Sequence, residues 1–193
     1  VFQGRTSTGV RGIDLKDGDF VIGMTVLRHT AVEPAESRAY LKHAAAMRRA
    51  MGEEGPPEPE TPDTDDPVEG GEAALSTERI AELGAREEFI LTVTSDGLGK
   101  RASSYEYRVT GRGGKGLIAH RLADKDARLV ASFPVHEGEE LLLVTDQGQL
   151  IRMPIDQIRI AGRATQGVTL IRTNDNEHVV AAERLEDVGE DGE

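Results

Sequence analysis

An internal repeat with a period of 51 residues limits what this chain can fold into. Residues 91–112 (LTVTSDGLGKRASSYEYRVTGR) align without a gap with residues 142–163 (LLVTDQGQLIRMPIDQIRIAGR). The repeat ends in Gly-Arg-x-x-x-Gly, here called the Gly-Arg box, which occurs at 4–9, 111–116 and 162–167. A repeat of this length indicates copies of one supersecondary unit arranged side by side.

Each unit has the pattern of short antiparallel strands. Residues 89–94 are rich in β-branched side chains and end in Ser95-Asp96-Gly97, and residues 141–145 end in Asp146-Gln147-Gly148. Both patterns predict β-hairpins, with 149–153 as the second partner strand. We also expect a hairpin from 168–172 and 178–182, and an apolar strand at 20–22, which matches 129–131 and 179–181. Four short strands in about 50 residues predict an all-β fold of propeller-like blades.

One segment, residues 33–88, interrupts this repeat. Removal of this segment would leave Gly4 and Gly111 one period of the repeat apart. We expect a helix over 33–51 with Pro34 at its first position and a second helix from Ser76 to about residue 88. The stripe of Tyr40, Ala44, Met47 and Met51 is expected to pack against the partner helix. Nine acidic and no basic residues at 52–73 predict a disordered acidic loop between the helices.

The acidic charge of the chain is confined to two segments. The net charge is −12, but residues 33–88 alone hold 15 acidic and 6 basic residues, and the tail 185–193 holds five acidic residues and no basic one. Residues 98–121 instead carry six basic residues against Glu106 alone. Charges are screened within about 8 Å at physiological salt, so a partner at 98–121 meets a basic surface.

Composition also excludes several classes of protein. There is no Cys, which excludes disulfides, a Cys-ligated zinc site and a thiol nucleophile. No apolar run reaches the length of a membrane-spanning helix and the first residues lack a signal-peptide pattern, so we expect a cytoplasmic protein without a membrane partner. The first residue is Val1, and we expect the chain to be a fragment.

The search for reactive groups finds no catalytic constellation. The Gly-Arg box at 111–116 lacks the Gly-Lys-Ser/Thr ending of a Walker loop and is predicted to lie among strands. The five histidines are scattered without ligand spacing, so no metal site and no cofactor is predicted. Tyr105 and Tyr107 have no activating base nearby in the sequence and are expected to pack in a strand.

Basic residues recur at equivalent positions of the repeat. Arg101 matches Arg152, and Arg5, Arg112 and Arg163 follow the first glycine of each Gly-Arg box. If equivalent positions point outward along one rim, they form a curved basic track for a phosphate backbone. The alternative is that each arginine braces its own blade. The predicted DNA-binding residues are Arg5, Arg11, Lys100, Arg101, Arg108, Arg112, Lys115, Arg121, Arg152 and Arg163.

Residues 4–13, 90–116 and 141–173, with the acidic C-terminal end, resemble the C-terminal region of the bacterial DNA gyrase A protein. The resemblance implies part of a β-pinwheel of six blades that wraps DNA on its basic rim. It implies a role in ATP-dependent negative supercoiling by a type II topoisomerase. Residues 112–116 match the core of the family's Gln-Arg-Arg-Gly-Gly-Lys-Gly motif. That motif belongs to the first blade, whereas this copy sits in a late one, so only phosphate contact is carried over to Arg112 and Lys115.

The resemblance also implies an organisation and a set of partners. We expect part of a blade at 1–32, the helical insertion at 33–88, a blade at 89–137, the last blade at 138–184 and an acidic tail at 185–193. The implied partners are double-stranded DNA, the rest of a homodimeric gyrase A protein, and the gyrase B protein in an A2B2 assembly. ATP, magnesium and the DNA-cleaving tyrosine belong to other domains of that holoenzyme, which is cytoplasmic and associated with the chromosome.

Two other functions remain open from the sequence. One is the C-terminal domain of the A-type protein of topoisomerase IV, which carries a related disc. The other is a propeller-like protein-interaction module that uses residues 40–51 as a docking helix. A further hypothesis is that the acidic loop and tail compete with DNA for the basic rim.

Overall fold

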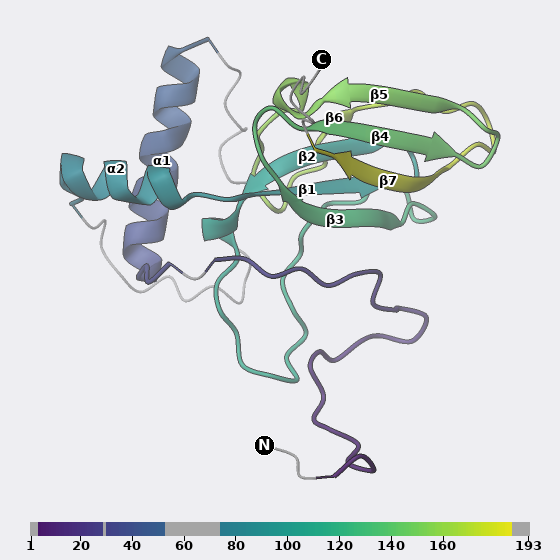
Figure 1. The fold of residues 1–193 in the computed structure, drawn as a ribbon, viewed down its shortest axis with the longest axis horizontal. Coiled ribbons are helices and arrows are strands. Elements are labelled where there is room, and N and C mark those ends of the chain that lie inside the picture. Colours follow the sequence, from purple (N-terminus) through teal and green to yellow (C-terminus); the bar gives the residue numbers. More distant parts are fainter. Residues whose placement is uncertain (1–3, 29, 53–73, 187–193) are drawn as a thin grey trace, which may run out of the picture.

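Two antiparallel β-sheets and a pair of helices make up the computed structural model, which describes residues 4–28, 30–52 and 74–186. Figure 1 shows the helices on one side of the sheets and residues 4–28 extended away from them. In chain order the elements are α1 (Pro34–Ala50), α2 (Thr77–Arg86), β1 (Phe89–Thr94), β2 (Leu98–Ser103), η1 (Ser104–Glu106), β3 (Leu129–Val135), β4 (Glu140–Thr145), β5 (Leu150–Pro154), η2 (Ile155–Gln157), β6 (Val168–Thr169) and β7 (Val179–Leu185).

The repeat reappears as two hairpins with the same register. Leu91 of β1 lies opposite Arg101 of β2, and Leu142 of β4 lies opposite Arg152 of β5. These pairs occupy equivalent positions of the repeat. Each sheet gains a third strand on the other side, β3 beside β1 and β7 beside β4. The two predicted hairpins at 89–103 and 140–154 are confirmed.

The fourth strand of the first sheet comes from the following repeat. The strand order is β3-β1-β2-β6 in one sheet and β5-β4-β7 in the other. The predicted hairpin from 168–172 and 178–182 is wrong, because β6 pairs with β2 while β7 pairs with β4. The second repeat therefore contributes β6 to the sheet of the first repeat, which connects the two repeats.

One apolar core joins the two sheets. Leu91 and Val93 of β1 and Leu141 and Leu143 of β4 have no exposed surface and belong to a single cluster. Each aliphatic side chain buried in this way contributes about 1.5–3 kcal/mol relative to exposure to water. The core therefore fixes the two sheets against each other and sets the positions of the loops at their ends.

Residues 4–28 form no strand, although an apolar strand was expected at 20–22. Phe20 is 65% exposed and Met24 is 91% exposed. The segments that match it in the repeat, β3 and β7, pair with β1 and β4. The described residues include no ladder partner for 20–26, and a lone strand has no hydrogen bonds to hold it extended. The assignment of 1–32 to part of a blade stays a prediction.

The helical insertion begins and ends close to the predicted positions. Pro34 is the first residue of α1, and Glu33 and Glu36 form a capping box there. Ser76 caps α2 by accepting from the backbone N–H of Arg79 at 3.1 Å. The acidic stretch at 53–73 and the tail at 187–193 lie outside the described residues.

The insertion is anchored to the first sheet through η1. The rings of Tyr40 and Tyr105 meet edge to face at 5.4 Å, and the Ser37 hydroxyl donates to the Tyr105 carbonyl oxygen at 2.7 Å. Tyr105 thus lies in η1 and not in a strand, contrary to expectation. The stripe on α1 is buried only in part, because Tyr40 is 4% exposed but Met51 is 70% exposed.

Candidate nucleic-acid interface

Lys100 lies inside the protein and holds the last Gly-Arg box. It is in β2 and has no exposed surface. Its Nζ donates to the carbonyl oxygens of Gly162 at 2.7 Å and Thr165 at 2.6 Å, and also to that of Arg163. Burial lowers the pKa of Lys100 to about 8, so the ammonium persists at neutral pH, where three carbonyl acceptors stabilise it. Lys100 is therefore not placed to meet DNA.

Glu106 and Arg163 hold the same box from its other side. The Glu106 carboxylate accepts from the backbone N–H of Arg163 at 2.5 Å, and the Arg163 guanidinium donates to the carbonyl oxygen of Ile118 at 2.5 Å. Arg163 is 7% exposed. Burial raises the pKa of Glu106, against the opposing effects of the Arg163 N–H and of the Lys100 charge. The box is thus fixed to the preceding repeat by the buried Lys100 and Arg163 and by the partly buried Glu106.

Arg101 and Arg152 occupy the same repeat position but differ in environment. Arg101 is 7% exposed, and its guanidinium donates to the carbonyl oxygens of Ile158 at 2.6 Å and Asp156 at 3.1 Å. The side chain of Arg152 is 62% exposed and donates to Glu140 at 2.5 Å. The difference arises because residues 158–161 run along β2 and bond to the backbone of Arg101.

The expectation that basic residues at equivalent positions all point outward is therefore wrong for Arg101 and Arg163, and Lys100, which has no basic counterpart in the next repeat, is buried as well. All three are buried and donate to backbone carbonyl groups. This agrees with the alternative that such residues brace the fold, although the groups that they hold belong to the neighbouring repeat. Arg5, Arg11, Arg108, Arg112, Lys115, Arg121 and Arg152 are exposed.

In every copy of the Gly-Arg box, the backbone conformation at the last position favours glycine. Gly9, Gly116 and Gly167 have φ of 76°, 80° and 79°, a region that other residues rarely adopt. At Gly167 a Cβ atom would also lie 2.5 Å from the carbonyl oxygen of Gly99. The sequence left two explanations open, positive φ or close approach, and both apply at Gly167.

The exposed basic residues gather in the segment between η1 and β3. We call residues 107–121 the basic loop. It contains Arg108, Arg112, Lys115 and Arg121, all exposed, and no acidic residue. Figure 1 shows this segment extending from the sheets toward the N-terminal segment. The sequence of the basic loop thus has a local excess of positive charge, carried by exposed side chains.

The basic loop is paired with residues 11–14. The N–H of Gly113 donates to the Gly12 carbonyl oxygen at 2.9 Å, and the N–H of Asp14 donates to that of Gly114 at 2.9 Å. Arg11 forms an exposed ion pair with Asp14 at 2.7 Å. The second Gly-Arg box therefore lies beside the preceding repeat, as the third one does, but with its Arg and Lys side chains exposed.

His120 anchors the C-terminal end of the basic loop. It is 8% exposed, its Nδ1 lies 2.9 Å from the Thr92 hydroxyl and its Nε2 lies 2.7 Å from the Gln166 carbonyl oxygen. Burial, together with the charge of Lys100, lowers the pKa of His120 to about 4. His120 is thus neutral at physiological pH and supports the loop from within.

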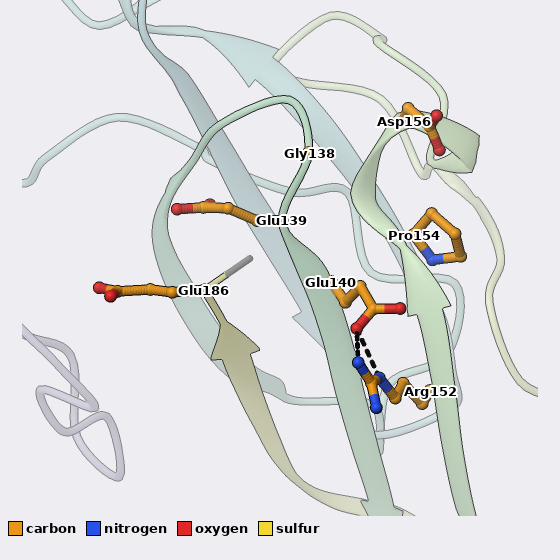
Figure 2. A pocket seen from close by; sticks show the side chains of 7 residues that line it. All are labelled: Gly138, Glu139, Glu140, Arg152, Pro154, Asp156 and Glu186. Carbon is orange, nitrogen blue, oxygen red and sulfur yellow. Dashed lines mark hydrogen bonds and ion pairs between the residues drawn. The ribbon is translucent and has the colours of Figure 1, made fainter. Parts of the chain in front are cut away.

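Arg152 lines an acidic depression on the second sheet, where β4 begins and β5 ends. Figure 2 shows its side chain directed at Glu140, with Asp156 and Glu186 also lining the depression. Carboxylates repel a phosphate backbone. Arg152 is thus exposed in a setting that is unfavourable for DNA.

Glu106 and His120, which hold the Gly-Arg box and the basic loop, were not predicted from the sequence. Glu106 had a signal, since it is the single acidic residue among 98–121. His120 had none. Within the described ranges, no group of three His, Cys, Asp or Glu residues is arranged to hold a metal ion, and no helix is long and apolar enough to cross a membrane.

The amino-acid sequence of this chain is similar along its whole length to part of known DNA gyrase A proteins. The DNA gyrase A protein of Granulibacter bethesdensis is 50% identical over 202 residues, which cover 100% of this chain and 22% of that protein. The DNA gyrase A protein of Rickettsia bellii is 43% identical over 195 residues, which cover 100% of this chain and 20% of that protein. The chain thus spans about a fifth of the length of these curated relatives.

The chain is also similar to a solved structure and to one family of protein domains. The structure of a DNA gyrase A C-terminal domain aligns with a TM-score of 0.47 and 24% identity over 51% of this chain and 34% of that one. Residues 1–28, 88–136 and 139–186 match the family described as "DNA gyrase C-terminal domain, beta-propeller". These matched segments include both repeats and leave out most of the helical insertion. The chain belongs to the family of DNA gyrase C-terminal β-propeller domains.

Proposed function

We propose that this chain binds and wraps double-stranded DNA as a module of a DNA gyrase A protein. The observation that carries the proposal is the basic loop, a 15-residue segment whose sequence holds four exposed basic residues and no Asp or Glu, on a fold of this family. Lys and Arg side chains that neutralise phosphates bind DNA without regard to sequence. The proposed contacts are Arg108, Arg112, Lys115 and Arg121, with Arg5 and Arg11 on the neighbouring segment.

The buried basic residues have a different part in this proposal. Lys100, Arg101 and Arg163 bond to carbonyl groups of adjacent repeats, and they set how one blade lies against the next. Wrapping requires a track of fixed curvature, because DNA bends only at a cost. These residues therefore shape the track, while the exposed ones contact the phosphates.

The proposal assigns a place to each segment. Residues 1–32, 89–137 and 138–184 belong to successive blades, 33–88 is an insertion, and 185–193 is an acidic tail. In the holoenzyme the chain works beside the rest of a homodimeric gyrase A protein and the gyrase B protein. We place strand cleavage, ATP hydrolysis and their magnesium in those other parts, and ATP-dependent negative supercoiling is the activity of the whole.

Binding of the full-length protein that carries this chain to duplex DNA across a salt series tests the proposal. The variant Arg108→Gln/Arg112→Gln/Lys115→Gln/Arg121→Gln removes four exposed charges. If all four contact phosphates, the slope of log K against log salt falls in magnitude by about 3.6. The control is Lys16→Gln/Lys125→Gln, which changes exposed lysines outside the basic loop. Binding that does not depend on salt, or equal slopes for wild type and variant, would overturn the proposal.

The two alternatives from the sequence receive less support. The two curated relatives described above are gyrase A proteins, and neither is a topoisomerase IV protein. A docking helix over residues 40–51 would need Tyr40, which is 4% exposed and packs on Tyr105. DNA wrapping is therefore the function that we carry forward.

A further inference from the structure

The part of the basic loop that carries Arg112 and Lys115 is rich in glycine. The Gly-Arg box at 111–116 has four glycines, whereas the third Gly-Arg box, at 162–167, has two. Both Arg112 and Lys115 are exposed. Glycine loses more conformational freedom on folding than any other residue, so a segment of this composition does not hold its own shape. The position of these two side chains therefore depends on bonds from the basic loop to other segments.

The C-terminal end of the basic loop, residues 118–121, is bonded to the third Gly-Arg box. The Arg163 guanidinium donates to the carbonyl oxygen of Ile118 at 2.5 Å. The backbone N–H of Arg121 donates to the carbonyl oxygen of Thr165 at 3.0 Å. One bond is donated by the box and the other by the loop, so the two segments are joined side by side over several residues.

His120 adds a third bond between the same two segments. Its Nε2 lies 2.7 Å from the Gln166 carbonyl oxygen, and its Nδ1 lies 2.9 Å from the Thr92 hydroxyl. Because a carbonyl oxygen can only accept, Nε2 carries the hydrogen and Nδ1 accepts from Thr92. Thr92 is in β1 and has no exposed surface. The imidazole thus connects the basic loop, the third Gly-Arg box and the first sheet.

The third Gly-Arg box is itself held by residues at the end of β2 and in η1. The Lys100 Nζ donates to the carbonyl oxygens of Gly162 at 2.7 Å and Thr165 at 2.6 Å. The Glu106 carboxylate accepts from the N–H of Arg163 at 2.5 Å. The box therefore has bonds to the preceding repeat on two sides. In the contact between the two Gly-Arg boxes, the third is the fixed partner and the glycine-rich one is the partner that is positioned.

We propose that Arg163 and His120 are positioning residues for DNA binding, which hold the basic loop against the third Gly-Arg box so that Arg112 and Lys115 meet the phosphate backbone. One copy of the box then contacts DNA, and the next copy holds it in place. Loss of Arg163 leaves every charge of the loop, but DNA must then order the loop, and that ordering weakens binding. This inference rests on the proposed function, because it assumes that DNA is bound at the basic loop.

A double-mutant cycle in the full-length protein tests the inference. It combines Arg163→Met with Arg108→Gln/Arg112→Gln/Lys115→Gln/Arg121→Gln, here called the loop-charge variant, and measures Kd for a duplex at one low salt concentration. In the wild-type background Arg163→Met should weaken binding about tenfold. In the loop-charge variant the same change should weaken binding less than about twofold, because the charges that Arg163 positions are gone.

Arg184→Met is the matched control. Arg184 also donates to a backbone carbonyl oxygen, that of Pro134 at 3.3 Å, but Pro134 lies in β3 and outside the basic loop. This variant should bind DNA as wild type does. Thermal unfolding checks that each variant is folded. If Arg163→Met does not fold, His120→Leu, which removes the bond to Gln166, takes its place in the cycle and should give the same pattern.

The outcomes separate this inference from the proposed function. Equal Kd values for wild type and the loop-charge variant would overturn both. Weaker binding by the loop-charge variant, together with an unchanged Kd in folded Arg163→Met, would overturn the inference alone. Weakening by the same factor in both backgrounds would also contradict it, because Arg163 would then contact DNA itself or act on another part of the protein.

Discussion

The Nζ of Lys100 lies 2.7 Å from the carbonyl oxygen of Gly162, a residue 62 positions further along the chain. Gly162 is the first residue of the Gly-Arg box of the following repeat. The position equivalent to Lys100 in the next repeat is Ile151. The Lys100 side chain thus holds the Gly-Arg box of the neighbouring repeat against β2.

Loss of the Lys100 ammonium should destabilise the fold. In Lys100→Met the apolar stem remains, but the carbonyl groups of the 162–165 segment lose their donor, at a cost of about 3 kcal/mol. Urea titrations of wild type and variant measure this loss in the free energy of unfolding. The comparison is Ile151→Met, which changes the equivalent position without removing a hydrogen bond and should cost less than about 1.5 kcal/mol. Equal losses of stability in the two variants would argue against the role of Lys100 in holding the Gly-Arg box.

The two arginines at one repeat position should differ in the same way. Arg101→Met removes buried bonds to Ile158 and Asp156, and we expect a loss of about 2–4 kcal/mol in the free energy of unfolding. Arg152→Met removes an exposed ion pair and should cost less than about 1 kcal/mol. The same urea titration compares both. A larger loss at Arg152 than at Arg101 would contradict the assignment.

Substitution of the last glycine of the third Gly-Arg box should be costly. Gly167 has a φ of 79°, and a Cβ atom there would approach the Gly99 carbonyl oxygen to 2.5 Å. Gly167→Ala should therefore lower stability by more than about 1 kcal/mol. Gly111 begins the second box and has open space around it, so Gly111→Ala should change stability by less than about 1 kcal/mol. Thermal unfolding of both variants decides whether the box needs its last glycine for these reasons.

His120 should make the fold sensitive to acid. Burial lowers the pKa of His120 from 6.5 to about 4 in the folded state. Between these two pH values the imidazole is therefore protonated in the unfolded chain but neutral in the folded one. Stability is then fully present above about pH 6.5 and is lost as the pH falls toward 4, by up to about 3 kcal/mol. In His120→Gln this dependence disappears. Unfolding free energies of both proteins between pH 4 and 7 test it, and parallel curves would contradict it.

Local patterns predicted much of the fold. The hairpins at 89–103 and 140–154 and the helix starts at Pro34 and Ser76 depend on turn residues and caps within a few positions of one another. The pairing of β6 with β2 was missed, because it depends on which strand edge is open after the core has formed. A two-residue strand carries too little pattern to show its partner.

The sequence predicted which basic residues belong to the candidate site, but not which of them are exposed. The repeat placed Arg101 and Arg152 at one position, and the sequence cannot show that residues 158–161 cover only the first. The same applies to Lys100, whose role depends on the Gly-Arg box of the following repeat. Charge excess in the sequence pointed to residues 98–121, and within that stretch the structure exposes Arg108, Arg112, Lys115 and Arg121 but buries Lys100 and Arg101.

The most direct test of DNA wrapping is the linking number of closed-circular DNA. Nicked plasmid is bound by the full-length protein without ATP, sealed by a ligase, stripped of protein and resolved on a gel. The account predicts a linking difference that grows with bound protein and shrinks in the Arg108→Gln/Arg112→Gln/Lys115→Gln/Arg121→Gln variant, because wrapping stores a crossover. DNA that is bound but keeps the linking number of protein-free plasmid would contradict it.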